Sequence, residues 1–385
     1  MSLNVAEPAA VTAPPITAAA AAEERISVAT QRQLMWWRFR KHRLAMVATV
    51  VVALFYVVVL FAGFLAYADP EASEAQRGLI APQPIYLIND DGRFQPHVVS
   101  LAGRRDPVTF KRVYVPDPNR KLPLTFLAQG FPYKLFGLIP TDRHLLGVEG
   151  ARTEESLFVL GTDLEGRDMW SRLMYGTSTS LTIGLLSVAV SLVLGVVLGG
   201  VSGFFGGAID TIIQRVIEIL RSVPTIPLWM GLAAAMPRDW DIYRVYFAIT
   251  IIISLIGWTE LARVVRGRFL SLRQEDFVTA AELSGCSRRR VIFVHMVPLF
   301  LSHIIAATTL ALPAMIISET SLSFLGLGLR PPAISWGVLL QQAQNVQTLA
   351  ISPWLLLPAL PVIVVILGFN FLGDGLRDAA DPYGV

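Results

Sequence analysis

Long stretches without a charged residue constrain the fold of this chain more than any other feature. The first runs from residue 44 to 68 and is rich in Val, Leu, Ala and Phe. A helix needs about 20 apolar residues to cross the hydrocarbon of a bilayer, so this stretch is long enough to span it. Further stretches lie at residues 173–209, 222–237, 245–259, 291–318 and 331–373. One span in each predicts an all-α polytopic membrane protein with about six transmembrane helices.

The composition excludes several other classes of protein. Only 16% of the residues are charged, against roughly 25% in soluble domains, which argues against a cytosolic enzyme. A net charge of +3 is too small to indicate a partner nucleic acid. The single cysteine, Cys286, excludes an internal disulfide framework and a multi-cysteine metal cluster.

Two basic clusters predict the orientation of the spans. The first precedes residue 44 and consists of Arg38, Arg40, Lys41 and Arg43. The second lies between the fourth and fifth stretches and consists of Arg263, Arg266, Arg268, Arg273, Arg288, Arg289 and Arg290. Short basic loops stay on the cytoplasmic side, so an even number of spans places both termini there. The alternative is that the first stretch is a cleaved signal peptide ending at Ala68, although its apolar run exceeds the usual length of about 7 to 15 residues.

The chain between and beyond the spans divides into segments of different character. Ten prolines in the mixed-charge segment after the first span exclude long helices there, and β-prone pieces lie at residues 84–88 and 108–115. This extracytoplasmic insert is either a small domain that meets a soluble partner or an irregular cap. The expected segments are a disordered cytoplasmic tail at 1–35, a basic lead-in and first helix at 36–68, the insert at 69–172, a transmembrane core at 173–373 with a cytoplasmic loop at 263–295, and a cytoplasmic tail at 374–385.

The sequence contains no constellation typical of an enzyme or a metal site. A phosphate-binding loop needs Gly-Lys followed by Ser or Thr, and none of the four lysines follows a glycine. His295 and His303 lack a carboxylate or cysteine at matching spacing, so we expect no metal, cofactor or catalytic residue in this chain. The acidic residues near the spans are expected to reach water at the span ends: Asp210, Glu218, Glu260, Glu319 and Asp374. A self-sufficient ion-coupled carrier stays as an alternative.

A short helix is expected inside the loop at 263–295. Asp276 can cap its start and Gly285 can end it. Helical spacing places Phe277, Ala281 and Ser284 on one face, and the small alanines allow another surface to approach closely. This shape is suited to docking against a partner protein.

Several motifs resemble one family of membrane proteins. TAAELSG at residues 279–285, followed by HMVP at 295–298, resembles the E-A-A signature of the membrane subunits of bacterial ABC importers. Further blocks resemble the C-type permeases of the dipeptide, oligopeptide and nickel branch: WRFRKHRLA at 37–45, LGTDLEGRDMWSRLMYG at 160–176, GFFGGAID at 203–210, ETSLSFLGLG at 319–328, SWG at 335–337 and NFLGDGLRDAADP at 370–382. They follow a compatible order over residues 37–382, and agreement of all of them by chance is implausible.

The resemblance implies the type I ABC importer permease fold and a passive subunit driven by separate ATPases. It implies a second homologous permease, two ATP-binding cassette ATPases that use ATP and Mg, and an extracytoplasmic solute-binding protein, with the chain itself in the bacterial inner membrane among its lipids. The short helix would then be the coupling helix that docks into an ATPase groove. Coupling residues are expected to be Phe277, Thr279, Ala280, Ala281, Glu282, Ser284, Gly285 and Pro298. Thr279 stands where the signature has glutamate.

The translocation path is expected beside helix breaks and polar steps in the spans. The candidates are Pro224, Pro227, Ser318, Glu319 and Ser321. Gly195, Gly199, Gly200 and Gly203 form a stripe of small residues that predicts close helix packing. Peptides are the expected solute, with oligosaccharides, nickel or another non-peptide solute as alternatives.

Overall fold

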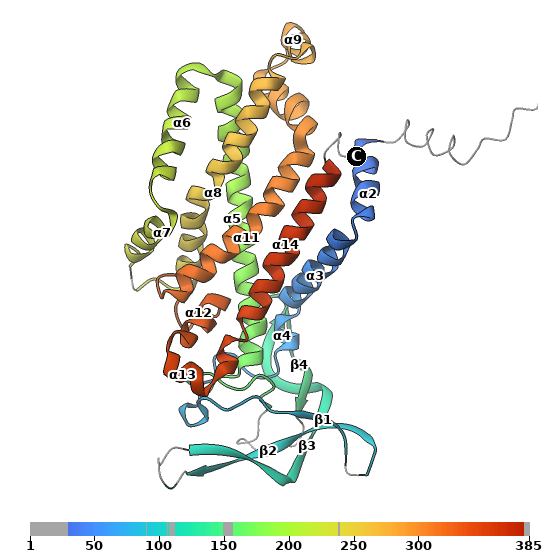
Figure 1. Ribbon diagram of the computed structural model, residues 1–385, viewed down its shortest axis with the longest axis vertical. Coiled ribbons are helices and arrows are strands. Elements are labelled where there is room, and N and C mark those ends of the chain that lie inside the picture. Colours follow the sequence, from blue (N-terminus) through green and yellow to red (C-terminus); the bar gives the residue numbers. More distant parts are fainter. Residues whose placement is uncertain are drawn as a thin grey trace, which may run out of the picture.

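A computed structural model describes residues 30–89, 91–105, 107, 112–148, 157–237 and 239–380. It consists of a bundle of long helices with a β-sheet at one end and the short helix α9 at the other (Figure 1). We call these the sheet end and the α9 end. The all-α prediction therefore holds for the bundle alone, because the insert folds into four strands. Of the tail predicted at residues 1–35, residues 1–29 lie outside the described part of the chain.

The described residues contain five helices that are long and apolar enough to cross a membrane. The spans predicted from the first, second, fourth, fifth and sixth charge-free stretches correspond to α3 (Arg43–Leu60), α5 (Met169–Phe205), α8 (Ile242–Leu272), α11 (Leu301–Phe324) and α14 (Ala359–Ala380). The bundle also contains α2 (Gln31–Lys41), α4 (Ala62–Leu65), α10 (Arg288–Arg290), α12 (Trp336–Gln341) and α13 (Val346–Ile351), with single turns at η1 (Ala75–Arg77), η4 (Gln342–Gln344) and η5 (Pro353–Leu356).

The third predicted span, where Pro224 and Pro227 were expected to break or kink the helix, is a bent pair of helices. α6 (Gly207–Ser222) and α7 (Thr225–Ala234) meet at an angle of 87°. The break follows from Pro224, since the residue before a proline avoids the helical region and Val223 is extended with ψ at 132°. The described residues therefore contain six candidate spans only if this bent pair counts as one.

The other boundaries differ from the prediction at both ends of the bundle. α8 continues through Arg263, Arg266 and Arg268 to Leu272, so the first part of the predicted loop at 263–295 is helical. α14 likewise continues to Ala380 and takes in the start of the predicted C-terminal tail. At the other terminus Thr30 begins α2 with a capping box, so residues 31–35 are also helical. α8 and α14 thus continue through polar residues beyond their charge-free stretches, whereas α2 is a separate helix before the first span.

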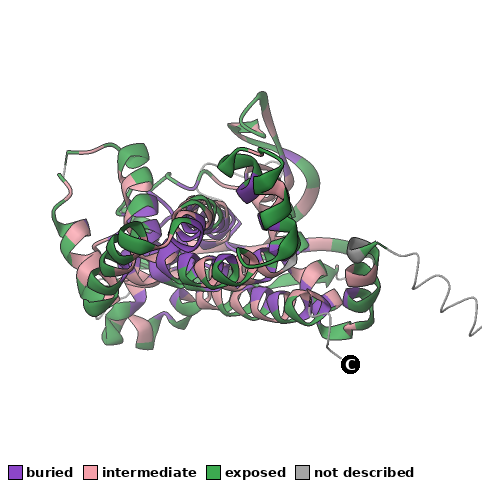
Figure 2. Cartoon of the chain, turned by 90° about the horizontal axis from the view of Figure 1, so that it is seen from above, coloured by how far each residue is buried: buried purple, intermediate pink, exposed green. Residues whose placement is uncertain are grey.

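Small residues bring α5 and α8 together in the middle of the bundle, where buried residues gather (Figure 2). A Cβ on Gly195 would lie 2.9 Å from Leu261, and one on Gly199 would collide with the backbone of Ala262. Ser187 and Ser254 add hydrogen bonds across the same contact. The predicted role of the glycine stripe in close helix packing is confirmed.

The insert forms an antiparallel sheet in the order β1-β2-β3-β4. The strands are β1 (Ile85–Ile88), β2 (Phe94–Arg105), β3 (Arg112–Leu135) and β4 (Ile139–Val148). β1 confirms the β-prone piece at 84–88, while residues 108–111 of the second piece lie outside the described residues. The long β3 pairs with β2 up to Pro123 and with β4 from Leu124 onward, so one strand connects the two halves of the sheet.

Candidate functional site

The α9 helix (Asp276–Leu283) projects from the end of the bundle opposite the sheet (Figure 1). Its N-cap is Glu275, which makes no side-chain cap bond, so the predicted cap at Asp276 is wrong by one residue. The predicted end at Gly285 is confirmed, because this residue has φ of +76° and the N–H of Cys286 then bonds to the carbonyl oxygen of Ala281. Glycine suits this left-handed position at the end of a helix.

The inner face of α9 is anchored to the bundle by Val278. This side chain is 1% exposed and belongs to an apolar cluster with Phe204 of α5, Phe269 of α8 and Met296. Ala281 is half-buried against the same cluster. The predicted face of Phe277, Ala281 and Ser284 is therefore wrong as one surface, since Ala281 turns inward while the other two are exposed.

The outer face of α9 carries an apolar residue that sequence reasoning missed. Leu283 is 86% exposed, and Phe277 is 38% exposed. The coupling candidates Thr279, Ala280, Glu282 and Ser284 are also exposed. The available signal was a leucine directly before the Ser-Gly helix end in an otherwise polar loop. An exposed leucine on a short, anchored helix is a suitable contact for a partner protein.

Charged residues connect the base of α9 to the turn between α5 and α6. Arg266 on α8 donates two hydrogen bonds of 2.6 Å to the carboxylate of Asp210 on α6. Arg273 donates to the carbonyl oxygen of Phe204 at 3.1 Å, and the guanidinium of Arg288 lies 5.4 Å from the centre of the Phe205 ring. A bidentate arginine–carboxylate pair fixes geometry as well as charge, so α8 is held in a defined position against α6.

Between α9 and α11 the chain leaves regular α-helical hydrogen bonding. Residues Val291–Met296 form a π-helix (η2) and Val297–Phe300 a 3₁₀ turn (η3) that contains Pro298. Regular α-helix begins at Leu301. Pro298 accounts for part of this interruption, since proline lacks the N–H that an α-helix needs. Pro298 itself lies in the connection to α11 and not on α9.

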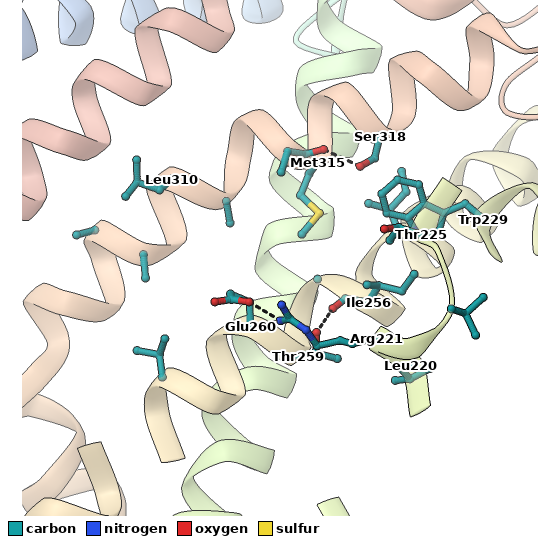
Figure 3. Close-up of a pocket in the computed structure, with 18 of the residues that line it drawn as sticks. Leu220, Arg221, Thr225, Trp229, Ile256, Thr259, Glu260, Leu310, Met315 and Ser318 are labelled. Atoms are coloured by element: carbon teal, nitrogen blue, oxygen red, sulfur yellow. Dashed lines mark hydrogen bonds and ion pairs between the residues drawn. The ribbon is translucent and has the colours of Figure 1, made fainter. Parts of the chain in front are cut away.

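A second candidate site is a cavity of about 740 Å³ beside the break between α6 and α7 (Figure 3). α7 contributes Thr225 and Trp229, while α11 contributes Met315 and Ser318. The indole N–H of Trp229 is buried and has no hydrogen-bond partner among the described residues. The wall of the cavity is largely apolar, and this buried N–H is enclosed by protein atoms and is not exposed to the cavity.

Charged groups lie at one side of this cavity. Arg221 at the end of α6 forms an ion pair with Glu260 of α8. His303 of α11 and Arg377 of α14 also line the cavity. Arg221 and Glu260 balance each other in this ion pair, so Arg377 is the further cation in an otherwise largely apolar wall.

The path candidates from the sequence fall in different places. Ser318 lines the cavity, while Pro224 and Pro227 flank its lining residues in the helix break, and Ser321 lies outside the lining set. Glu319 is fully buried, so the expectation that it reaches water is wrong. A helix turns by about 100° per residue, which separates neighbours such as 318 and 319.

Glu319 is instead a brace between helices. Its carboxylate accepts hydrogen bonds from Ser180 of α5 at 2.9 Å and from Ser323 at 2.8 Å. The same two hydroxyl groups accept the backbone N–H groups of Trp336 and Leu329. The carboxylate thus organises the loop that returns from α11 to α12.

The block at residues 160–176 ties the start of α5 to the rest of the sheet end. Asp163 is completely buried and forms ion pairs with Arg167 at 2.7 Å and with Arg172 at 3.4 Å. Asp168 caps α5 by accepting the N–H of Ser171. Within the described part of the chain, no three His, Cys, Asp or Glu residues come together as metal ligands would.

Comparisons with known proteins agree with one another. Residues 191–383 match the family described as binding-protein-dependent transport system inner membrane component. Residues 30–90 match the N-terminal transmembrane domain of oligopeptide transport permease C.

Individual relatives include the oligopeptide transport system permease protein OppC of Haemophilus influenzae, 39% identical over 243 residues that cover 63% of this chain and 75% of that protein. The dipeptide transport system permease protein DppC of Lactococcus lactis is 31% identical over 354 residues, or 90% of this chain and 89% of that protein. Among solved structures, an inward-facing MetNI methionine ABC transporter chain has a TM-score of 0.41 and 17% identity, over 54% of this chain and 95% of that chain.

Proposed function

The chain belongs to the family of binding-protein-dependent transport system inner membrane components, and we propose that it forms half of the translocation pathway of an ATP-driven importer of peptides. It is a multi-pass inner-membrane permease subunit. Peptides are the proposed solute because the relatives are named as oligopeptide and dipeptide permeases.

The observation that carries this proposal is the α9 helix, with one anchored face and one free face. Val278 fixes it to the apolar cluster at the base of α5, α8 and η2, while Leu283 points out from the bundle. In the proposed mechanism α9 docks into a groove of an ATPase subunit. Closure of two ATPases on ATP then pushes α9, and the contacts of Arg266 and Arg273 pass the movement to α5, α6 and α8. Thr279 lies on this exposed surface in place of the signature glutamate and offers a hydroxyl there.

The cavity between α7, α8 and α11 is proposed to be half of the solute path, completed by a second, homologous permease. In this assignment Thr225, Trp229 and Ser318 face the solute, and Pro224 and Pro227 produce the bend that opens the wall. Glu319 shapes the path indirectly through the loop after α11.

The proposed topology is that of a type I importer permease. Both termini and α9 are assigned to the cytoplasm by the arginine clusters, and the segment at 69–172 to the opposite side, where a solute-binding protein delivers the solute. The remaining proposed segments are a tail at 1–35, a lead-in and first span at 36–68, a core at 173–373 with the coupling loop at 263–295, and a C-terminal tail at 374–385. ATP and Mg are used only by the partner ATPases.

Affinity purification in mild detergent from the native membrane tests the assembly. We expect the tagged chain to carry a second permease and ATPase subunits, with vanadate-sensitive ATP hydrolysis that a solute-loaded binding protein stimulates. Transporters reconstituted into vesicles should then transport peptides only when ATP is present on the side of the membrane where the ATPase subunits lie. A chain that purifies alone and moves solute with an ion gradient would overturn the proposal in favour of an ion-coupled carrier.

A further inference from the structure

We propose that the turn of the β3–β4 hairpin inserts into the lipid bilayer beside the first span. We call residues 135–139 the hairpin tip. The proposal requires that α3 spans the membrane, which its length and hydropathy support, and it is independent of which solute is transported. The occupant of the apolar surface on the hairpin tip is lipid acyl chain.

The hairpin is fixed against the end of the first span by three contacts. Tyr133 packs directly on Gly63 of α4, where a Cβ would collide with its ring. The Nδ1 atom of buried His144 lies 2.9 Å from the carbonyl oxygen of the same glycine. Phe136 meets the ring of Phe61 edge to face, with centroids 5.2 Å apart. The hairpin therefore has a defined height relative to the span, as its position beside α4 shows (Figure 1).

The position of the hairpin tip along the first span places it within the hydrocarbon layer of the bilayer. The charge-free stretch begins after Arg43 and continues to residue 68. Counting about 20 residues for the hydrocarbon from Leu44 places its far boundary near Gly63. Phe61 lies before this boundary, so the ring of Phe136 that touches it lies at the depth of the acyl chains.

The exposed side chains of the hairpin tip are those that lipid accepts and water does not. Leu138 is 82% exposed, Ile139 56% and Phe136 49%. Residues 135–141 carry no charge, and Lys134 stands at the border, where its long side chain can reach the headgroups. Three large apolar groups on one solvent-facing turn would be unfavourable in water.

The backbone of the hairpin tip supports the same conclusion. Phe136 has φ of +55° and Gly137 has φ of +72°, and the N–H of Leu138 bonds to the carbonyl oxygen of Leu135 at 3.1 Å. A turn with positive φ at both central residues prefers Asn, Asp or Gly at those positions. An aromatic residue with positive φ is disfavoured, and Asn at 136 would relieve the backbone while removing the ring from Phe61. Position 136 thus carries an apolar phenylalanine although its positive φ favours Asn, Asp or Gly.

Lipid is the favoured occupant because the tip continues a surface that already faces lipid. α3 carries large apolar residues that are about half exposed along its length: Val50, Leu54, Val57 and Leu60. The last of these directly precedes Phe61, on which the tip rests. A soluble partner would require a polar rim, whereas the nearest charged residues after the tip are Asp142 and Arg143 farther up β4.

Fluorescence quenching in the complete transporter tests the insertion. The single native cysteine allows a Cys286→Ser background, in which Leu138→Cys carries an environment-sensitive fluorophore. Phe94→Cys is the matched control, because this residue is 76% exposed and begins β2, in the half of the sheet that pairs away from the hairpin. Both labelled transporters are placed in nanodiscs with either nitroxide-labelled acyl chains or iodide in the buffer.

We expect the acyl-chain nitroxide to quench the label at 138 several-fold more than the label at 94, and iodide to show the opposite order. Equal quenching of both labels by iodide would overturn the proposal, because the tip would then lie in water. Protection of the label at 138 from both quenchers would also overturn it, because another protein chain would then cover the tip. Retained ATP-driven uptake in both variants separates either result from a failure of the proposed function.

Discussion

The hydroxyl of Tyr67 donates a hydrogen bond of 2.7 Å to Oδ1 of Asp168, which joins the end of the first span to the start of α5. The other carboxylate oxygen accepts the N–H of Ser171 at 2.7 Å and caps the helix. The Tyr67 hydroxyl in turn accepts the N–H of Val159. A single buried carboxylate therefore holds three segments that are distant in the sequence.

Asp168→Asn is predicted to flatten the pH dependence of stability. Burial raises the pKa of Asp168 from 3.8 to about 6, although hydrogen bonds from Ser171 and Tyr67 oppose this shift. Between about pH 4 and pH 6 the folded chain retains a proton that the unfolded chain has lost. The free energy of unfolding therefore falls as pH rises through this interval and levels off above it.

Thermal unfolding of the purified complex across this range measures the effect. The native chain should lose about 3 kcal/mol between the two limits, while the Asn variant, which keeps the acceptor for the cap, should not. Parallel pH profiles for the two chains would contradict the assignment.

Leu283→Asp is predicted to uncouple ATP hydrolysis from transport. The side chain is 86% exposed, so its replacement should change folding stability by less than about 0.5 kcal/mol. A carboxylate on the proposed docking face should nevertheless abolish solute-stimulated ATPase activity and uptake. Val346→Asp on α13 is the control, since Val346 is 78% exposed at the other end of the bundle. Normal uptake by the Leu283 variant would remove α9 from the mechanism.

Gly199→Ala is predicted to destabilise the contact between α5 and α8. The new Cβ would collide with the backbone of Ala262, which cannot move without the whole helix, at a cost of about 1–3 kcal/mol. Gly267→Ala in α8 is the matched control, because a Cβ there meets nothing within 4 Å. Alanine is the better helix former, so the control should gain up to about 1 kcal/mol. Chemical unfolding of both variants checks the difference, and equal effects would refute the packing argument.

Glu319→Ala is predicted to be more damaging than Glu319→Gln. Alanine leaves the hydroxyls of Ser180 and Ser323 without their acceptor, which costs about 1–3 kcal/mol, whereas Gln retains one oxygen. The unfolding temperature and the rate of peptide uptake should both fall in the Ala variant. The alternative is that an imposed proton gradient drives uptake by the native chain but not by the Gln variant. Glu319 would then be a proton carrier and not a brace.

The spans were the most predictable part of the fold, since a charge-free stretch has few alternatives to a membrane helix. The boundaries were less predictable because charged residues at helix ends can still be helical. Arg266 illustrates this, as its pairing with Asp210 on α6 makes it part of α8 and not of a loop. The bend at Pro224 was visible in the sequence. Whether α6 and α7 form one bent span or two separate elements depends on how α7 packs, which the sequence does not show.

The candidate site was predictable in position and less so in detail. TAAELSG located α9, but the direction of each side chain followed from Val278, which the motif does not single out. Once Val278 is buried, Ala281 turns inward and Leu283 outward. Glu319 was misplaced because its partner Ser180 on α5 is far from it in the sequence.

The shared strand β3 has a consequence for how this protein can vary among relatives. β2 holds β3 only up to Pro123, and β4 holds it only from Leu124. Within the sheet the two halves therefore share β3 alone, while Val98 of β2 is buried separately against Tyr67 and Leu157. The hairpin keeps its seat on Gly63 through contacts of its own, so a change of length at the outer ends of β1 and β2 leaves that seat unaltered.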